Sequence, residues 1–283
     1  MSLSSFRTLA GTTRETHMIK MTLLFKLTIS SLSLKPISPN SKKSLKMAHC
    51  TTISSSSNSI PISSDNCNSK RKLPILLFDV MDTLVRDPFY HDIPAFFRMS
   101  MKELLECKHP TAWAEFEKGL INEMELATKF FKDGRPLDLE GLKACMRRGY
   151  SYLDGVEPLL QGLKKNNYEM HAFTNYPNWY TMIEEKLKIS SYVSWTFCSC
   201  ITGKRKPEVD FYLEALKHLE VDPANCIFID DRMVNVEAAR NAGIIGVHFK
   251  DAACLQQELS LLGIEFSTDA EDVTDQDLIK LNT

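Results

Sequence analysis

Five short apolar segments recur along residues 71–262, and stretches with helical periodicity separate them. Continuous apolar runs of this length are typical of parallel strands that are buried on both faces. A regular alternation of such strands with helices predicts an α/β fold, a Rossmann-like doubly wound parallel sheet. The expected strands cover residues 73–80, 168–174, 193–198, 225–229 and 244–249, and the expected helices cover residues 178–188, 208–219, 234–241 and 252–262.

One long insertion interrupts this alternation between the first and the second strand. Residues 88–149 carry no strand signal and are predicted to form three or four helices. We expect them to make a helical cap that is hinged at residues 85–88 and 149–154. Within the cap, Pro94 opens a helix that contains Phe96, Phe97 and Leu104, and a second helix carries Trp113 and Phe116. Asn122 and Glu125 form a capping box, and residues 139–148 form the last helix.

The first seventy residues differ in composition from the rest of the chain. They contain nine Lys or Arg, two acids and seventeen Ser, which leaves 34 − 9 = 25 bases and 36 − 2 = 34 acids, a net charge of −9, for the remainder. A basic, Ser-rich and acid-poor leader is typical of an organelle transit peptide. The excess of Ser and Thr over Arg favours the chloroplast stroma over the mitochondrion. A disordered tail with no targeting role is the alternative.

These features predict four parts of the chain. A disordered transit peptide covers residues 1–70, and the core of the fold covers residues 71–87 and 150–262. The helical cap covers residues 88–149, and an acidic tail covers residues 263–283.

Composition also excludes several classes of protein. The sequence has no run of eighteen apolar residues, so we expect no membrane-spanning helix. The charge balance offers no basic field for a nucleic acid. The eight Cys form no Cys-x-x-Cys pair and no Cys/His ligand spacing, so free reduced thiols are expected rather than zinc sites or disulfides. The oligomeric state stays open.

Polar side chains of complementary types follow the expected strands at their carboxyl ends, the edge where doubly wound sheets bind ligands. Two facing carboxylates suit Mg²⁺, which prefers oxygen ligands, and a lysine with a hydroxyl beside a metal suits a phosphoryl group. A carboxylate at this edge can attack phosphorus and form an aspartyl-phosphate. The residues are Asp79, Asp82, Thr174, Asn175, Lys206, Asp230 and Asp231, with Asn235 shortly after.

Four of these segments, in this order, resemble the four motifs of the haloacid dehalogenase (HAD) superfamily. They are Phe78–Val85, Thr174-Asn175, Lys206-Pro207, and Asp230-Asp231 followed by Asn235. The resemblance covers residues 71–262, and the helical insertion stands where that family has its C1 cap. It implies a Mg²⁺-dependent phosphomonoester hydrolase that acts through an aspartyl-phosphate, with a small-molecule substrate as its partner.

The resemblance implies a role for each acidic motif residue. Asp79 is expected to be the nucleophile and a metal ligand. The backbone carbonyl of Met81 and the carboxylate of Asp231 are expected to complete the protein's share of the metal ligands. Asp230 is expected to orient the motif lysine or the metal's waters.

The same resemblance assigns the phosphate contacts. Thr174 and Asn175 are expected to hold the phosphoryl oxygens. Lys206 is expected to pair with Asp79 and with the transferred phosphate, and Asn235 to brace its loop.

One position departs from the family pattern. HAD phosphatases usually carry a second Asp two residues after the nucleophile, and this residue protonates the leaving oxygen and then activates water. Here that position is Met81, which can do neither. Asp82 is the nearest substitute, with Asp87 and His91 next. In a regular strand Asp82 would point to the opposite face, so a turn would have to redirect it.

Within the superfamily, three segments are similar to the plant plastid flavin mononucleotide (FMN) hydrolases: Asp79–Tyr90, Cys107–Pro110 and Gly203–Pro207. This similarity implies conversion of FMN to riboflavin and phosphate. Tyr176 and Trp179, which follow the second motif, are candidates for an aromatic wall against the flavin ring, and packing of cap against core is their alternative role.

Three other functions stay open at this stage. The first is a phosphatase for another small phosphometabolite. The second is a phosphate- or flavin-binding pseudoenzyme, which Met81 motivates. The third is carbon–halogen or phosphonate cleavage, because those HAD branches also lack the second Asp.

Overall fold

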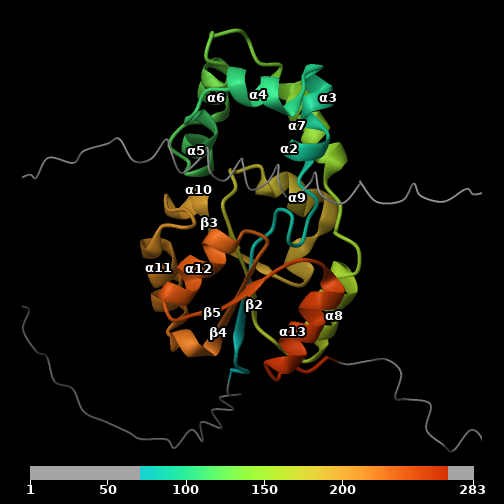
Figure 1. Ribbon diagram of the computed structural model, residues 1–283, viewed down its shortest axis with the longest axis vertical. Helices are drawn as coiled ribbons and strands as arrows, with labels where there is room; N and C mark the ends of the chain where they lie inside the picture. The colour runs from blue at the N-terminus through green and yellow to red at the C-terminus, as the bar shows by residue number, and fades with distance from the viewer. Residues whose placement is uncertain (1–70, 267–283) are drawn as a thin grey trace, which may run out of the picture. The chain divides into compact units, whose positions relative to one another are not determined.

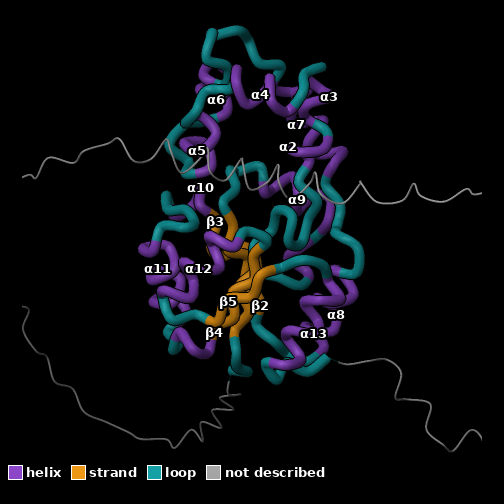
Figure 2. The backbone as a smooth tube through the Cα atoms, in the orientation of Figure 1, coloured by secondary structure: helices purple, strands orange, loops and turns teal. Residues whose placement is uncertain are grey.

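The computed structural model describes residues 71–266, and the predicted transit peptide and most of the predicted acidic tail lie outside them. Five parallel strands form one sheet in the order β3-β2-β1-β4-β5, which confirms the predicted α/β doubly wound architecture. Helices cover both sides of the sheet (Figure 2). The strands are β1 (Ile75–Phe78), β2 (Met170–Thr174), β3 (Ser194–Cys198), β4 (Cys226–Asp230) and β5 (Ile245–His248).

The central strand, β1, consists only of apolar residues because it is buried on both faces of the sheet. Successive side chains of a strand point to opposite faces. Leu76 and Phe78 of β1 therefore join one buried cluster, while Ile75 and Leu77 join another on the opposite face. Because both faces are buried, all four residues of β1 are apolar, and the first polar residue, Asp79, follows the end of the strand.

The two faces of the sheet carry different helices (Figure 1). Buried residues of α8 (Val156–Lys165) and α13 (Ala252–Leu261) pack on the Leu76 face, and those of α11 (Val209–Leu219) and α12 (Met233–Asn241) pack on the Ile75 face. Sequence analysis did not identify α8, because Pro158 and Gly162 interrupt its helical pattern. The remaining helical elements of the core are α9 (Tyr180–Leu187), α10 (Ser199–Thr202) and the short 3₁₀ turns Ile189–Ser191 and Pro223–Asn225.

The insertion between β1 and β2 is helical, as predicted, but it contains six helical elements within residues 88–149 rather than three or four. The helix expected from Pro94 to Leu104 is two helices, because Arg98 adopts a left-handed conformation (φ 54°) and Ser100 starts a new helix with a capping box. The predicted capping box of Asn122 and Glu125 is confirmed. The elements are α2 (Pro88–His91), α3 (Ile93–Phe97), α4 (Met101–Cys107), α5 (Ala112–Glu117), α6 (Glu123–Lys129) and α7 (Leu139–Gly149).

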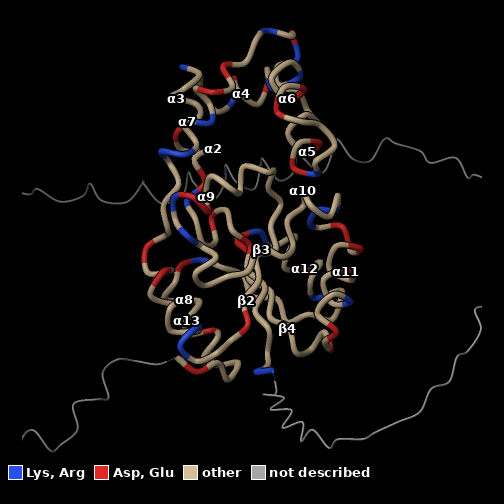
Figure 3. The backbone as a smooth tube through the Cα atoms, turned by 180° about the vertical axis from the view of Figure 1, so that it is seen from behind, with Lys and Arg blue, Asp and Glu red and all other residues tan. Residues whose placement is uncertain are grey.

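Two chain crossings connect this helical cap to the sheet. The crossings run antiparallel: Val85 bridges Tyr152, the amide of Arg86 donates to Ser151 O at 2.9 Å, and that of Leu153 donates to Leu84 O at 3.0 Å. Acidic and basic residues are interspersed along the cap and the core (Figure 3). Within residues 71–266, no helix combines the length and the apolar character needed to cross a membrane.

Candidate active site

An ion-paired cluster occupies the carboxyl edge of the two central strands. Lys206 Nζ lies 2.8 Å from Asp79 Oδ1 and 2.6 Å from Asp230 Oδ2. All three residues are buried, with Lys206 only 2 % exposed. The predicted nucleophile and the predicted lysine are therefore in direct contact.

The register of the strands explains why Asp79 and Asp230, which are far apart in the sequence, lie close together. β1 and β4 are neighbours, Phe78 pairs with Ile229, and the amide of Asp79 donates to Ile229 O at 2.8 Å. The residues that follow this pair, Asp79 and Asp230, therefore lie side by side at the same edge of the sheet. Burial disfavours the ammonium of Lys206, but the charges of Asp230 and Asp79 outweigh this effect and raise its pKa above the usual value.

Asp230 is held by a second set of donors. Asn235 Nδ2 lies 3.0 Å from each of its carboxylate oxygens, and the amide of Arg232 donates to Oδ1 at 2.8 Å. These bonds leave Asp230 oriented toward Lys206. Asn235 therefore braces the carboxylate that orients the lysine, which is more specific than the loop-bracing role expected from sequence.

Three carboxylates at this edge can hold a cation. Oxygen atoms of Asp79, Asp230 and Asp231 lie within 4.8 Å of one another. Burial, followed by the charges of Asp79 and Asp230, raises the pKa of Asp231 to about 8, and burial, opposed mainly by Lys206, raises that of Asp79 to about 6. Three acids against one lysine leave an excess of negative charge, so the donor set fits a hard divalent cation such as Mg²⁺.

Hydrogen bonds also fix the loop that carries Asp231. Thr83 Oγ1 accepts from the Asp231 amide at 3.1 Å, and His248 Nε2 lies 2.8 Å from Asp231 O. Sequence analysis included Thr83 only within the first motif, Phe78–Val85, and it did not identify His248. In the sequence, the available signal was the position of His248 near the end of the expected strand 244–249. In the structure, His248 pairs with Asp230 in the strand register.

The two residues of the second motif differ in the atoms they leave available. Thr174 is fully buried, and its Oγ1 has no hydrogen-bond partner among residues 71–266. The Asn175 side chain instead donates to Lys206 O at 2.8 Å and accepts from the Lys206 amide at 2.7 Å. The Asn175 side chain thus binds the backbone of the lysine loop, and the expected contact of Asn175 with the phosphoryl oxygens stays a prediction.

The turn after β1 redirects Asp82, as its predicted role requires. Asp82 has a φ of 56°, a left-handed conformation that Asp tolerates better than most residues. Its Oδ1 accepts from the amide of Asp87 at 2.9 Å. The side chain consequently faces the ascending crossing, where the cap begins.

Tyr176 and Trp179 are buried where the cap meets the core. Trp179 is 1 % exposed, its Nε1 donates to Glu123 Oε1 of α6 at 2.6 Å, and its ring packs edge-on against Trp113 and Phe116 of the cap. Tyr176 is 3 % exposed. Trp179 therefore packs cap against core, which is the alternative role, and both rings are almost wholly buried.

Further bonds join cap and core on the same side. Arg205, next to the motif lysine, pairs with Glu117 of α5 at 2.8 Å. Ser199 Oγ donates to Glu117 O at 2.5 Å and accepts from the Tyr176 amide at 3.0 Å. Sequence analysis missed Glu117, Arg205 and Ser199, because nothing in the sequence indicates that a cap helix contacts the lysine loop.

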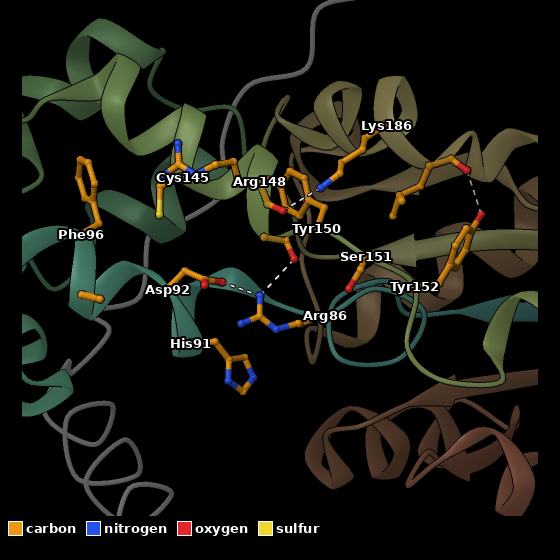
Figure 4. Close-up of a pocket in the computed structure, with 13 residues that line it drawn as sticks. Arg86, His91, Asp92, Phe96, Cys145, Arg148, Tyr150, Ser151, Tyr152 and Lys186 are labelled. Carbon is orange, nitrogen blue, oxygen red and sulfur yellow. Dashed lines mark hydrogen bonds and ion pairs between the residues drawn. The ribbon is translucent and has the colours of Figure 1, made fainter.

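A separate cleft of about 750 Å³ lies at the two crossings, and no motif residue lines it (Figure 4). Two of its cations, Arg86 and Lys186, already have partners. Arg86 Nη1 lies 2.5 Å from Asp92 Oδ2 and 3.1 Å from Gly149 O, and Lys186 donates to the carbonyls of Arg147 and Arg148. These bonds hold the end of α7 against the core, so the cleft is part of the hinge rather than of the reaction site.

Comparison with known proteins agrees with this geometry. A sequence model of the haloacid dehalogenase-like hydrolases matches residues 74–243. The chain is 65% identical over 205 residues to flavin mononucleotide hydrolase 1 of Arabidopsis thaliana, a protein named as chloroplastic, covering 72% of this chain and 84% of the relative.

Two solved structures share the fold. A predicted HAD-like hydrolase from Porphyromonas gingivalis has a TM-score of 0.57 at 19% identity, covering 68% of this chain and 98% of that one. A HAD enzyme from Bacteroides thetaiotaomicron, an Asp-to-Ala mutant in complex with magnesium and inorganic phosphate, has a TM-score of 0.52 at 19% identity, covering 64% and 95%. The chain belongs to the haloacid dehalogenase-like hydrolase family.

Proposed function

We propose that this protein is a Mg²⁺-dependent phosphatase that hydrolyses FMN to riboflavin and phosphate. One observation carries the reaction class: a buried nucleophile candidate, Asp79, lies 2.8 Å from the ammonium of Lys206 at the edge where two further carboxylates meet. The 65% identity to the Arabidopsis FMN hydrolase supports the substrate. The HAD structure with magnesium and phosphate supports the metal.

The residues of the site have complementary roles in this proposal. Asp79 attacks phosphorus through one carboxylate oxygen and forms an aspartyl-phosphate. Lys206 keeps Asp79 ionised and offsets charge on the transferring phosphoryl group. Asp230 holds Lys206 in place through the bond at 2.6 Å, and Thr174 offers its unpaired hydroxyl to a phosphoryl oxygen.

Asp79, Asp231 and the carbonyl of Met81 would hold Mg²⁺. The bound ion would supply charge stabilisation of the phosphoryl oxygens. The raised pKa values of Asp79 and Asp231 support this assignment, because a cation next to them would favour the ionised carboxylates that burial disfavours.

The cap is proposed to provide substrate selection. Tyr176 and Trp179 act on the substrate through the position of the cap rather than by stacking on it. Residues of the cap that remain partly exposed are better candidates for contact with the flavin. Tyr90 is 56% exposed, and Lys108 Nζ lies 5.5 Å from the ring centroid of Phe89.

Chloroplast targeting agrees with the location in the name of the Arabidopsis relative. The leader that motivates it, residues 1–70, lies outside the described residues. We keep the proposed division into leader, core, cap and tail, with the hinge at the hydrogen-bonded crossings around Val85 and Tyr152.

A phosphate-release assay tests the proposal. The full-length protein is mixed with FMN, phosphoglycolate, a sugar phosphate and p-nitrophenyl phosphate, with Mg²⁺ or with EDTA. We expect release from FMN at the highest kcat/KM and none in EDTA. Preference for another metabolite would overturn the substrate, and equal activity in EDTA would overturn the metal.

A further inference from the structure

The proposed function leaves one chemical role unfilled, and the inference below rests on that function. An alkyl alcohol such as the ribityl group leaves poorly as an alkoxide, so it requires a proton as the P–O bond breaks. Met81 cannot donate one. The donor must be a protonated group under the cap, near Asp79.

Asp87 stands where the ascending crossing enters the cap. It is the N-cap of α2, and its Oδ1 accepts from the Phe89 amide at 2.8 Å. Its own amide donates to Asp82 Oδ1 at 2.9 Å. The backbone of Asp87 is therefore anchored to the turn after the nucleophile, and its side chain is partly buried.

Ionisable groups of several elements act on Asp87. The carboxylates of Asp82 and Asp79 act on it from the β1 turn, and that of Glu117 acts from α5. Its charge in turn acts on phenol groups of α2, the end of α7 and the loop after β2, namely Tyr90, Tyr150 and Tyr176.

This environment favours the protonated form of Asp87. Burial, together with the three carboxylates, raises the pKa of Asp87 to about 7, even though the Phe89 amide opposes the shift. Burial also raises the pKa of Asp82, but the amide of Asp87 opposes this shift, as do the charges of His91 and Arg86, whereas the neighbouring charges that act on Asp87 are all carboxylates. Two carboxyl groups whose environments differ in this way are suited to different roles.

We propose that Asp87 is the general acid and base of this enzyme, in place of the Asp that Met81 replaces. As Asp79 attacks phosphorus and the P–O bond to the substrate breaks, the leaving oxygen takes the proton of Asp87. In the second step the Asp87 carboxylate takes a proton from water, and the water oxygen attacks phosphorus. The bond from phosphorus to Asp79 then breaks, which releases phosphate and restores both carboxyl groups.

Two other candidates have different positions. Asp82 acts as a positioning residue, because its Oδ1 holds the amide of Asp87. His91 is exposed and lines the hinge cleft beside Arg86 (Figure 4).

Asp87→Asn is the primary test, because Asn is an equally good N-cap and keeps the acceptor for Phe89. Pre-steady-state cleavage, with substrate in excess over enzyme, is measured for FMN and for p-nitrophenyl phosphate, whose phenolate needs little protonation. We expect FMN cleavage to slow by about 10²–10⁴-fold. The p-nitrophenolate burst should persist and be followed by slow turnover, because hydrolysis of the aspartyl-phosphate also needs the base.

Two further variants complete the experiment. Asp87→Ser, which is also a good N-cap, should behave like Asp87→Asn, and adding Met81→Asp to Asp87→Asn should restore part of the FMN rate. An unchanged FMN cleavage rate, or an equal fall for both substrates, would overturn the role of Asp87. If the wild type does not hydrolyse FMN but hydrolyses glycerol phosphate, the flavin assignment fails. The role of Asp87 is then tested by comparing glycerol phosphate with p-nitrophenyl phosphate in the same variants.

Discussion

The floor of the site and the cap above it are held together in different ways. On the floor, Asp79, Lys206 and Asp230 are positioned by adjacent parallel strands and by buried ion pairs of 2.6–2.8 Å. The cap meets this floor through long-range side-chain contacts, such as Trp179 to Glu123 and Arg205 to Glu117. The floor is thus set by the backbone of the sheet, whereas the cap contacts can separate without unfolding a strand.

This difference suggests that the floor and the cap have separate functions. A rigid floor suits phosphoryl transfer, which depends on preorganised charges. A cap attached by two crossings and a few side chains suits entry and selection of the substrate. Changes to the floor should therefore affect all substrates, and changes to the cap contacts should affect large substrates most.

The largest expected effect comes from the nucleophile. Asp79→Asn keeps the shape of the side chain but lacks the attacking carboxylate, and loss of a catalytic nucleophile lowers kcat by on the order of 10⁶. We expect the loss to be equal for FMN and p-nitrophenyl phosphate. Asp251→Asn, at the N-cap of α13, is the matched control and should keep full activity. Retained turnover in Asp79→Asn would remove Asp79 from the mechanism.

Lys206→Met should affect both stability and activity. It leaves Asp79 and Asp230 buried without their ammonium, and breaking a buried pair in this way costs about 3–5 kcal/mol. Urea unfolding without metal measures the loss, and added Mg²⁺ should recover part of it. The control is Lys204→Met, whose partner Glu214 is at the surface. Equal stability of the two variants would mean that the floor does not depend on this pair.

The same contrast explains what the sequence could predict. Asp79, Thr174 and Asp230 are at strand ends, so apolar runs and parallel connections were sufficient to bring them together. Lys206 lies farther along, in the loop after α10, and its place was expected from the resemblance to the family motif. The turn at Arg98 and the helix α8 were missed, since local signals there conflict with the final structure. The partners of Trp179 and Asn175 were missed because each depends on a contact between segments far apart in the chain.

A smaller, substrate-dependent effect is expected at the cap contact. Trp179→Phe removes the bond to Glu123, and hydrogen bonds to charged groups contribute about 1.5–3 kcal/mol. KM for FMN should rise about tenfold or more, while kcat/KM for p-nitrophenyl phosphate stays near that of the wild type. Trp195→Phe is the control, because Trp195 donates to Glu184 within the core at 2.9 Å. Equal losses for both substrates would contradict the division between floor and cap.

The smallest effect is expected at the opposite end of the sheet. The hydrogen bond from Arg71 lowers the pKa of Glu169, just before β2, to about 2. A depressed folded-state pKa stabilises the protein above the unfolded value near 4.3, and this contribution disappears as the pH falls toward 2. Glu169 is partly exposed, so we expect at most about 1 kcal/mol.

Glu169→Gln should therefore lose less stability than the wild type between pH 5 and pH 3. Its activity at pH 7 should be unchanged, because Glu169 lies at the edge away from the site. Glu265→Gln, in an exposed pair with Lys72, serves as the control. An activity loss in Glu169→Gln would show that the two ends of the sheet are not independent.

The central claim is that phosphate passes from FMN to Asp79. Rapid acid quench of the wild type during FMN turnover, followed by peptide mass spectrometry, tests it directly. Asp87→Asn with p-nitrophenyl phosphate is the second sample, because that substrate should still phosphorylate this variant and the phosphoryl group should then be lost slowly. We predict one added phosphoryl group on the peptide that contains Asp79, present with Mg²⁺, absent in EDTA and absent when Asp79 is changed to Asn. FMN hydrolysis with no phosphoryl group on that peptide at any time, or with the group on another residue, would contradict the account.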